Sequence, residues 1–202
     1  MPELPEVETI RRQLNQAVIG HTISDIQILK DKSFRGNIDH ILKKQIARVD
    51  RIAKLMKFQF KDYQFPQLLC HLRMTGQLIY EPSQIAPRIV GGHPTPDWIN
   101  QLPSPHPRVI IPFDNSSKLF FNDQRIFGYL QIATSQKDLD HASQNFTGIE
   151  PLKPEFTLQE FKKRMKRTSQ PIKVAILDQK KVAGAGNIYA NEALFRAGID
   201  PR

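Results

Sequence analysis

The sequence of 202 residues is poor in cysteine and in long apolar runs. Its one cysteine, Cys70, excludes an internal disulfide and a zinc site built on several cysteines, and the surrounding run QLLCHL predicts a buried, inert thiol. No run approaches the 18 or more apolar residues of a membrane-spanning helix. The opening MPELPEVETI carries early carboxylates and lacks the apolar centre of a secretory signal. We therefore expect a cytoplasmic protein.

Acidic residues are too few to balance the basic ones. The 29 Lys and Arg residues oppose 20 Asp and Glu, which gives a net charge of +9. Residues 151–202 hold 11 of the basic and 5 of the acidic residues, so they carry +6 of that charge. A basic excess favours a polyanionic partner such as nucleic acid. Charge alone is weak evidence, because many basic proteins bind no nucleic acid.

The hydrophobic pattern begins with a helix and continues with short strands. Residues 5–19 predict a helix that has Pro5 in its first position, Gly20 as its stop, and one apolar face. That face consists of Val7, Ile10, Leu14 and Val18. Eight short apolar segments then predict strands, often with alternation, as in Met56, Phe58 and Phe60. These segments are 22–29, 46–50, 55–61, 67–72, 77–80, 108–113, 118–122 and 128–133.

Two other parts of the chain have a different pattern. Residues 82–112 hold eight of the 15 prolines, so we expect a long surface loop there. Thr157 and Glu160 have the spacing of a capping box and predict a helix whose apolar face holds Leu158, Phe161 and Met165. Two more helices are expected at 171–178 and 188–197.

The order of these elements predicts an α+β chain of two domains. Residues 1–135 are expected to form an eight-stranded β-sandwich with a leading helix, because short strands at this spacing are typical of sandwiches and barrels. Residues 136–202 are expected to form a helical domain. No internal repeat or low-complexity stretch interrupts them.

The first residues have groups that could carry out covalent chemistry. Removal of the initiator methionine would leave a free secondary amine at Pro2. A chain-terminal amine has a pKa of about 7.7–8.0, so an appreciable fraction is unprotonated at neutral pH and can form an iminium with an aldehyde-like carbon. Glu3 lies beside it and could move protons. In most proteins that begin Met-Pro-Glu, these two residues have no such role.

The longer string MPELPEVETIRRQL closely resembles the start of formamidopyrimidine-DNA glycosylases. The resemblance implies that Pro2 is the nucleophile and Glu3 the acid/base. Leu4 favours this branch over the endonuclease VIII branch, which usually has glycine there. The stretch RIAKLM resembles the family's R-x-A-K-Y-L and implies that Lys54 is an active-site lysine near the DNA backbone.

Two motifs resemble the family's base-flipping wedge, the set of side chains that fills the gap left by an extruded nucleotide. HLRMTGQL resembles HLGM-[ST]-G-x-L, which implies a phosphate contact at His71 and a wedge residue at Met74, with Arg73 in place of the usual glycine. NDQRIFGYL resembles D-P-R-[RK]-F-G, which implies that Arg125 and Phe127 complete the wedge. Gln124 and Ile126 replace the family's proline and basic residue.

Three further positions are implied to contact DNA. His106, in SPHPRV, matches a DNA-contacting histidine, and Lys173, in PIKVAILDQ, matches a lysine of the helical domain. VAGAGNIYANEALFRAGIDP resembles the centre of the family's helix–two-turn–helix element. In it, Gly184 and Gly186 let the backbone approach the duplex. Asn187 is expected to cap a helix whose N-terminus receives a phosphate.

The resemblance implies a base-excision-repair glycosylase and abasic-site lyase. It would remove oxidised purines (8-oxoguanine and formamidopyrimidines) through a Schiff base at Pro2, with β,δ-elimination. The implied partner is double-stranded DNA with oxidised bases or abasic sites, bound by a monomer at the bacterial nucleoid. The matching residues end before the family's zinc module of two CxxC pairs, so we expect no zinc or other cofactor and a weaker hold on DNA.

Two alternatives stay open. One is a non-catalytic or lyase-only DNA-binding remnant of the family. The other is a protein-interaction module, which only the proline-rich segment 82–112 favours.

Overall fold

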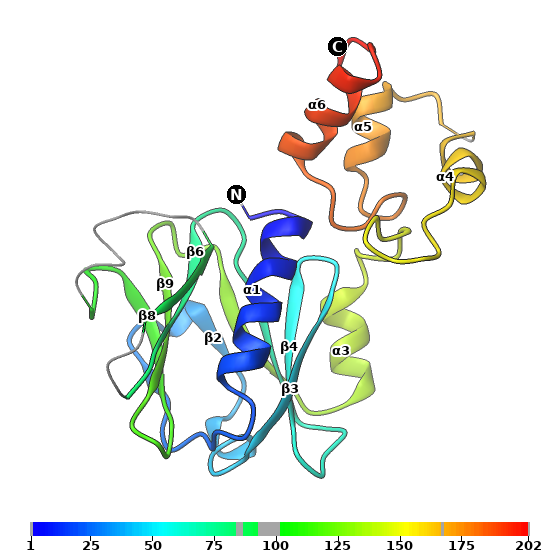
Figure 1. Ribbon diagram of the computed structural model, residues 1–202. Helices are drawn as coiled ribbons and strands as arrows, with labels where there is room; N and C mark the ends of the chain where they lie inside the picture. The colour runs from blue at the N-terminus through cyan, green and yellow to red at the C-terminus, as the bar shows by residue number, and fades with distance from the viewer. Residues whose placement is uncertain (1, 84–86, 93–101, 167, 202) are drawn as a thin grey trace. The chain divides into compact units, whose positions relative to one another are not determined.

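The chain folds into two compact units, Met1–Leu139 (the N-terminal unit) and Asp140–Arg202 (the C-terminal unit). The computed structural model describes residues 2–83, 87–92, 102–166 and 168–201 (Figure 1). The mixture of two sheets and several helices confirms the predicted α+β class. Among these residues, no helix has both the length and the apolar character that crossing a membrane requires.

Two five-stranded sheets build the N-terminal unit. The first holds, in spatial order, β1 (Gln27–Ile28), β8 (Pro107–Pro112), β9 (Lys118–Asp123), β6 (Gly76–Glu81) and β7 (Ile89–Gly92). The second holds β2 (Phe34–Arg35), β10 (Tyr129–Ala133), β5 (Gln67–His71), β4 (Leu55–Phe60) and β3 (Ile46–Ile52). Neighbouring strands are antiparallel, except that β2 and β10 are parallel. Two short 3₁₀ helices, Asp31–Ser33 and Ile38–His40, flank β2.

Each of the eight predicted segments overlaps one strand, and the alternation in β4 places Met56, Phe58 and Phe60 in the core. The predicted count of eight was nevertheless too low, because β2 and β7 were not expected. β7 lies inside the segment predicted as a loop, 82–112, so that prediction was wrong for Ile89–Gly92. The other parts of that loop prediction at 84–86 and 93–101 lie outside the described residues.

Helix α1 (Leu4–Ala17) packs against β7 and β3, which are edge strands of different sheets. Its predicted apolar face is confirmed, since Val7, Ile10 and Leu14 are all buried. β7 approaches this face very closely: a Cβ added at Gly91 would lie 2.1 Å from Cγ1 of Ile10. This close approach explains the glycine at position 91, since a side chain there would clash with Ile10, while pairing with β6 makes the segment a strand.

The core between the sheets includes Cys70, on β5, which is fully buried. Burial raises the pKa of its thiol above the ordinary value. The burial of this thiol expected from the sequence is therefore confirmed.

The C-terminal unit is helical. It contains α4 (Leu158–Met165), α5 (Ile172–Leu177) and α6 (Asn187–Arg196), and α5 packs against α6. Helix α3 (Gln136–Ser143), at the junction of the units, was not predicted because only Leu139 among its residues is buried. Thr157 caps α4 by accepting from the Glu160 backbone N–H at 3.2 Å. The predicted apolar face of α4 is only partly covered: Phe161 and Met165 are half-buried, whereas Leu158 is 63% exposed.

Candidate active site

Strand register brings three predicted site residues to one end of the inner strands of the second sheet. Leu55 at the start of β4 pairs with His71 at the end of β5, and His71 pairs with Tyr129 at the start of β10. Because these pairs are antiparallel, the residues just before β4 and β10 lie beside the end of β5. Lys54 directly precedes β4, and Phe127 lies two residues before β10, so both lie near the end of β5 that carries His71.

The first sheet brings three more to the same end of the unit. β6 begins at Gly76, opposite Asp123 at the end of β9, and the turn that leads into β6 carries Met74. The His106 carbonyl accepts a hydrogen bond from the Asp123 N–H at 3.1 Å. Arg125 follows Asp123 by two residues. The turn from β5 to β6 and the loop from β9 to β10 thus connect the two sheets at the predicted site.

Two of the proposed catalytic residues, Pro2 and Glu3, lie at the start of α1. Glu3 is the N-cap of α1 and is almost completely buried; its carboxylate accepts from the Glu6 N–H, and its own N–H donates to Glu6 Oε2 at 2.9 Å. Pro2 is also buried. Burial lowers the pKa of Lys54, while the nearby Glu3 and Glu6 carboxylates act to raise it. A lysine with a lowered pKa releases its proton more readily, and that suits it to proton transfer.

His71 is a neutral hydrogen-bond donor in this site. Burial, followed by the charges of Arg73 and Lys54, lowers its pKa from 6.5 to about 3. Its Nδ1 accepts from the Arg73 backbone N–H at 3.0 Å, so the single ring hydrogen is on Nε2. An uncharged Nε2–H group can donate a hydrogen bond to a phosphate oxygen. Because it carries no charge, it does not repel the neighbouring Arg73 and Lys54 cations.

Arg125 contacts both of the other proposed wedge residues. Arg125 Nη1 lies 3.5 Å from the Met74 sulfur, and the Arg125 guanidinium carbon lies 4.8 Å from the centre of the Phe127 ring. Met74 is 40% exposed and Phe127 51% exposed. Exposed large apolar side chains gathered with a cation are typical of surfaces that insert between bases.

Asp123 organises the wedge, and the sequence reasoning missed it. This fully buried carboxylate accepts from the Thr75 hydroxyl, from the Arg125 N–H at 3.2 Å and from the Gly128 N–H at 2.7 Å. It therefore ties the turn after Met74 to the loop that carries Arg125. The aspartate of the NDQRIFG motif was the available signal, but its role depends on contacts that the motif does not reveal.

Strained backbone also marks this end of the unit. Ala53, Arg73 and Ile126 have positive φ angles of 48°, 52° and 58°. Each is next to a predicted site residue. The left-handed conformation costs a non-glycine residue roughly 1–2 kcal/mol, and such strain gathers at functional sites. The case is strongest for Ile126, since β-branched residues seldom adopt it.

In the C-terminal unit, Lys173 is half-buried in the first turn of α5, and Asn187 is exposed. The predicted capping role of Asn187 was wrong: Asn187 is the first helical residue, Gly186 is the N-cap, and no side chain caps α6. Gln179 orders the preceding loop instead, because its side chain accepts from the Gly184 N–H and donates to the Ala185 carbonyl, both at 2.8 Å.

Comparisons with known proteins cover both units. The model of the formamidopyrimidine-DNA glycosylase N-terminal domain matches residues 1–130, and that of the family's H2TH domain matches residues 147–202. The formamidopyrimidine-DNA glycosylase of Ligilactobacillus salivarius is 35% identical over 205 residues, which cover 100% of this chain and 68% of the relative. The chain belongs to the formamidopyrimidine-DNA glycosylase family.

Solved structures of formamidopyrimidine-DNA glycosylases (Fpg) have the same fold. The Lactococcus lactis Fpg in complex with DNA that contains an abasic site has a TM-score of 0.79 at 28% identity, over 99% of this chain and 68% of that one. The Thermus thermophilus Fpg protein has a TM-score of 0.78 at 33% identity, over 99% of this chain and 66% of that one. In this family member, the described residues contain no group of three or more His, Cys, Asp or Glu placed to hold a metal ion.

Proposed function

We propose that this DNA glycosylase excises oxidised purines and then cleaves the resulting abasic site, with Pro2 as the nucleophile. The observation that carries the proposal is the pair of buried Glu3, at the start of α1, and buried Lys54, in the turn from β3 to β4, at the end of the unit where the wedge residues meet. Similar Lactococcus lactis structures are complexes with DNA that contains an abasic site or Fapy-dG, which supports damaged duplex DNA as the substrate.

The chemistry begins at the terminal amine. The Pro2 nitrogen attacks C1′ of the damaged nucleotide, and the base leaves with the electron pair of the glycosidic bond and takes up a proton. Transfer of a proton from the nitrogen to O4′ opens the sugar and forms an iminium at C1′. Glu3, beside Pro2, moves this proton.

The iminium then acts as an electron sink for strand cleavage. Loss of a proton from C2′ expels the 3′ phosphate, and a second elimination expels the 5′ phosphate. Lys54 acts on the phosphate side of the site, where its lowered pKa suits it to exchange protons. The Met74, Arg125 and Phe127 wedge fills the vacated stack, and Arg125 hydrogen-bonds the orphaned base.

The C-terminal unit contributes backbone contacts to DNA in this proposal. The first turn of α6 offers N–H groups and the positive end of the helix dipole to a phosphate. Lys173 and the basic run 162–167 add charge that is independent of DNA sequence.

Borohydride trapping tests the proposal. Borohydride reduces an iminium to a stable amine, so the chain should become covalently attached to a duplex with 8-oxoguanine opposite cytosine and to one with an abasic site. An undamaged duplex should give no adduct. An adduct with the abasic site alone would assign lyase activity only. The absence of an adduct with both duplexes would refute the proposed enzymatic activity.

Two changes at the N-terminus locate the nucleophile. An N-terminal tag should abolish trapping, and Pro2→Gly should weaken it while keeping a terminal amine. Pro5→Ala is the matched control, because Pro5 lies in the first turn of the same helix outside the proposed chemistry. Efficient trapping by the tagged protein would exclude Pro2 as the nucleophile.

A further inference from the structure

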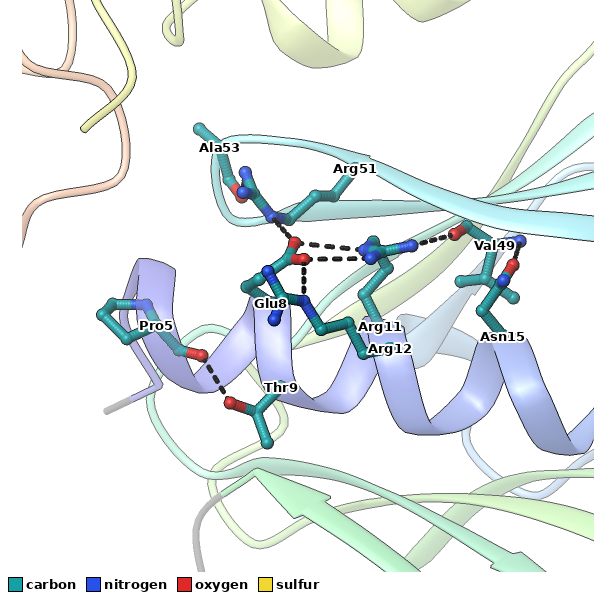
Figure 2. A network of polar contacts seen from close by, with 9 residues as sticks. All are labelled: Pro5, Glu8, Thr9, Arg11, Arg12, Asn15, Val49, Arg51 and Ala53. Carbon is teal, nitrogen blue, oxygen red and sulfur yellow. Dashed lines mark hydrogen bonds and ion pairs between the residues drawn. The ribbon is translucent and has the colours of Figure 1, made fainter. Parts of the chain in front are cut away.

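A network of charged side chains joins α1 to β3 beside the candidate active site (Figure 2). Glu8, on α1, accepts from three arginines: Arg11 at 2.9 and 3.1 Å, Arg12 at 2.7 Å and Arg51 at 2.6 Å. These contacts lower the pKa of Glu8 to about 2 although its burial acts in the opposite direction, so the carboxylate stays ionised at neutral pH. Arg11 also donates to the Val49 carbonyl at 3.1 Å.

Arg51 connects this network to the turn that carries Lys54. Its Nε binds Glu8, while its Nη1 donates to the Ala53 carbonyl at 3.3 Å (Figure 2). Ala53 has a strained φ of 48°, and Lys54 follows it directly. The guanidinium therefore holds the carbonyl of a left-handed residue whose conformation sets the direction of the next side chain.

The burial of this contact points to orientation as its role. The Arg51 and Glu8 side chains are 8% and 13% exposed. Replacing a buried ion pair by apolar residues often costs little stability, so stability alone is a weak reason for keeping one. A planar guanidinium that binds two fixed acceptors through different nitrogens does define a position.

We propose that Arg51 is a positioning residue that fixes the Lys54 ammonium relative to the Pro2 nitrogen. One of its contacts is to the helix that begins beside Pro2, and the other is to the turn that presents Lys54. The chain of contacts runs from Glu8 through the guanidinium to the Ala53 carbonyl. This inference rests on the proposed function, in which Pro2 and Lys54 act on the same sugar and phosphates.

The test compares Arg51→Lys with Arg12→Lys as a matched control. Both variants keep the charge, but a lysine has one nitrogen and cannot reproduce the fork. Arg12 contacts the same carboxylate from the solvent side, where it is 71% exposed. We expect Arg51→Lys to slow single-turnover cleavage of an abasic duplex about 10- to 100-fold, the usual effect of misplacing a reacting group. DNA affinity should change less than about twofold, and Arg12→Lys should leave both quantities unchanged.

A measurement without DNA separates this inference from the proposed function. Reductive ¹³C-methylation gives Lys54 an NMR signal that Lys54→Arg identifies, and this signal should move in Arg51→Lys and stay in place in Arg12→Lys. An unmoved signal would overturn the positioning role whether or not the chain is active. So would equal losses of rate and DNA affinity, or an unchanged rate. If Arg51→Lys does not fold, Glu8→Gln, which removes the charge but keeps the shape, takes its place.

Discussion

The two units bury their apolar side chains to different extents. In the N-terminal unit, the inner faces of both sheets form one core, and Phe58 and Phe121 are each 1% exposed. In the C-terminal unit, Leu158 is 63% and Phe195 is 81% exposed, and no residue of α4 is buried. The described part of the chain thus combines a densely packed unit with a loosely packed one.

This difference matches what each unit is proposed to do. Covalent chemistry at Pro2 requires reacting groups held to a fraction of an ångström, and only a rigid surrounding core can provide that. Binding phosphates through helix ends and cations tolerates more motion, because charge contacts depend weakly on exact geometry. Substitutions in either unit test whether tight packing and covalent chemistry go together in this way.

The largest effect is expected at Glu3. Glu3→Gln keeps an oxygen that can cap α1 but removes the proton-transfer group, so excision of 8-oxoguanine should fall by about 10²–10⁴-fold. Cleavage of a preformed abasic site should fall much less, because no base has to leave. Single-turnover gel assays on both substrates measure the two losses. Equal losses would mean that Glu3 mainly holds the helix.

Removing a core side chain should be the next largest effect. Phe58→Ala should destabilise the N-terminal unit by about 3–5 kcal/mol, as is usual for a buried phenylalanine. Residue-resolved hydrogen exchange should show the loss in β4 and its neighbours and leave α5 and α6 unchanged. Equal loss of protection in both units would show that they unfold together.

Acid should weaken the N-terminal unit through His71. Its folded pKa of about 3 lies below the ordinary 6.5, so between these values the unfolded chain binds a proton that the folded chain does not. The contribution of neutral His71 to the unfolding free energy is therefore complete above pH 6.5. It is lost as the pH falls toward 3, by an amount on the order of a few kcal/mol. Glu8, with a pKa of about 2, adds a second loss below pH 4.5. Urea unfolding of His71→Asn across this range should give a shallower fall, and an identical fall would contradict the assignment.

A smaller effect is expected on base recognition. Arg125→Ala should weaken the preference for cytosine opposite the lesion by about 1–3 kcal/mol. Lys173→Ala, in the other unit, is the comparison: it should weaken binding to every duplex and lower the salt dependence by about one phosphate contact. Binding titrations at several salt concentrations distinguish the two. Uniform weakening by both variants, with the preference retained, would remove Arg125 from the wedge.

The smallest effect is expected at Phe195. Since this side chain is 81% exposed, Phe195→Ser should change the unfolding free energy by no more than about 0.5 kcal/mol. Thermal unfolding followed by circular dichroism is sufficient to measure it. A loss above about 1 kcal/mol would show that this surface is covered in solution.

Much of the fold could be predicted from the sequence where burial is periodic. Apolar residues recur once per turn in α1 and at every second residue in β4, and both elements were predicted correctly. β7 could not be predicted, because two of its four residues are glycines and its place depends on the close approach to Ile10. α3 was missed for a similar reason, since it has one buried residue.

The candidate site could be predicted only as a set of residues. The motifs indicated Lys54, His71 and Phe127 separately, whereas their proximity at one end of the second sheet follows from strand register. The tautomer of His71 and the role of Asp123 depend on hydrogen bonds across turns that spacing cannot specify. Asn187 was misplaced by one residue, because glycine can also serve as an N-cap.

The buried thiol of Cys70 is a built-in probe of how often the N-terminal unit opens. As the chain's sole cysteine, lying fully buried on β5, it can react with a thiol reagent only when the sandwich opens. Its rate of modification therefore reports how often that unit opens, without an engineered label, while motions confined to the C-terminal unit leave the signal unchanged. If damaged DNA binds only the folded sandwich, adding it should slow the reaction by the factor that mass action predicts.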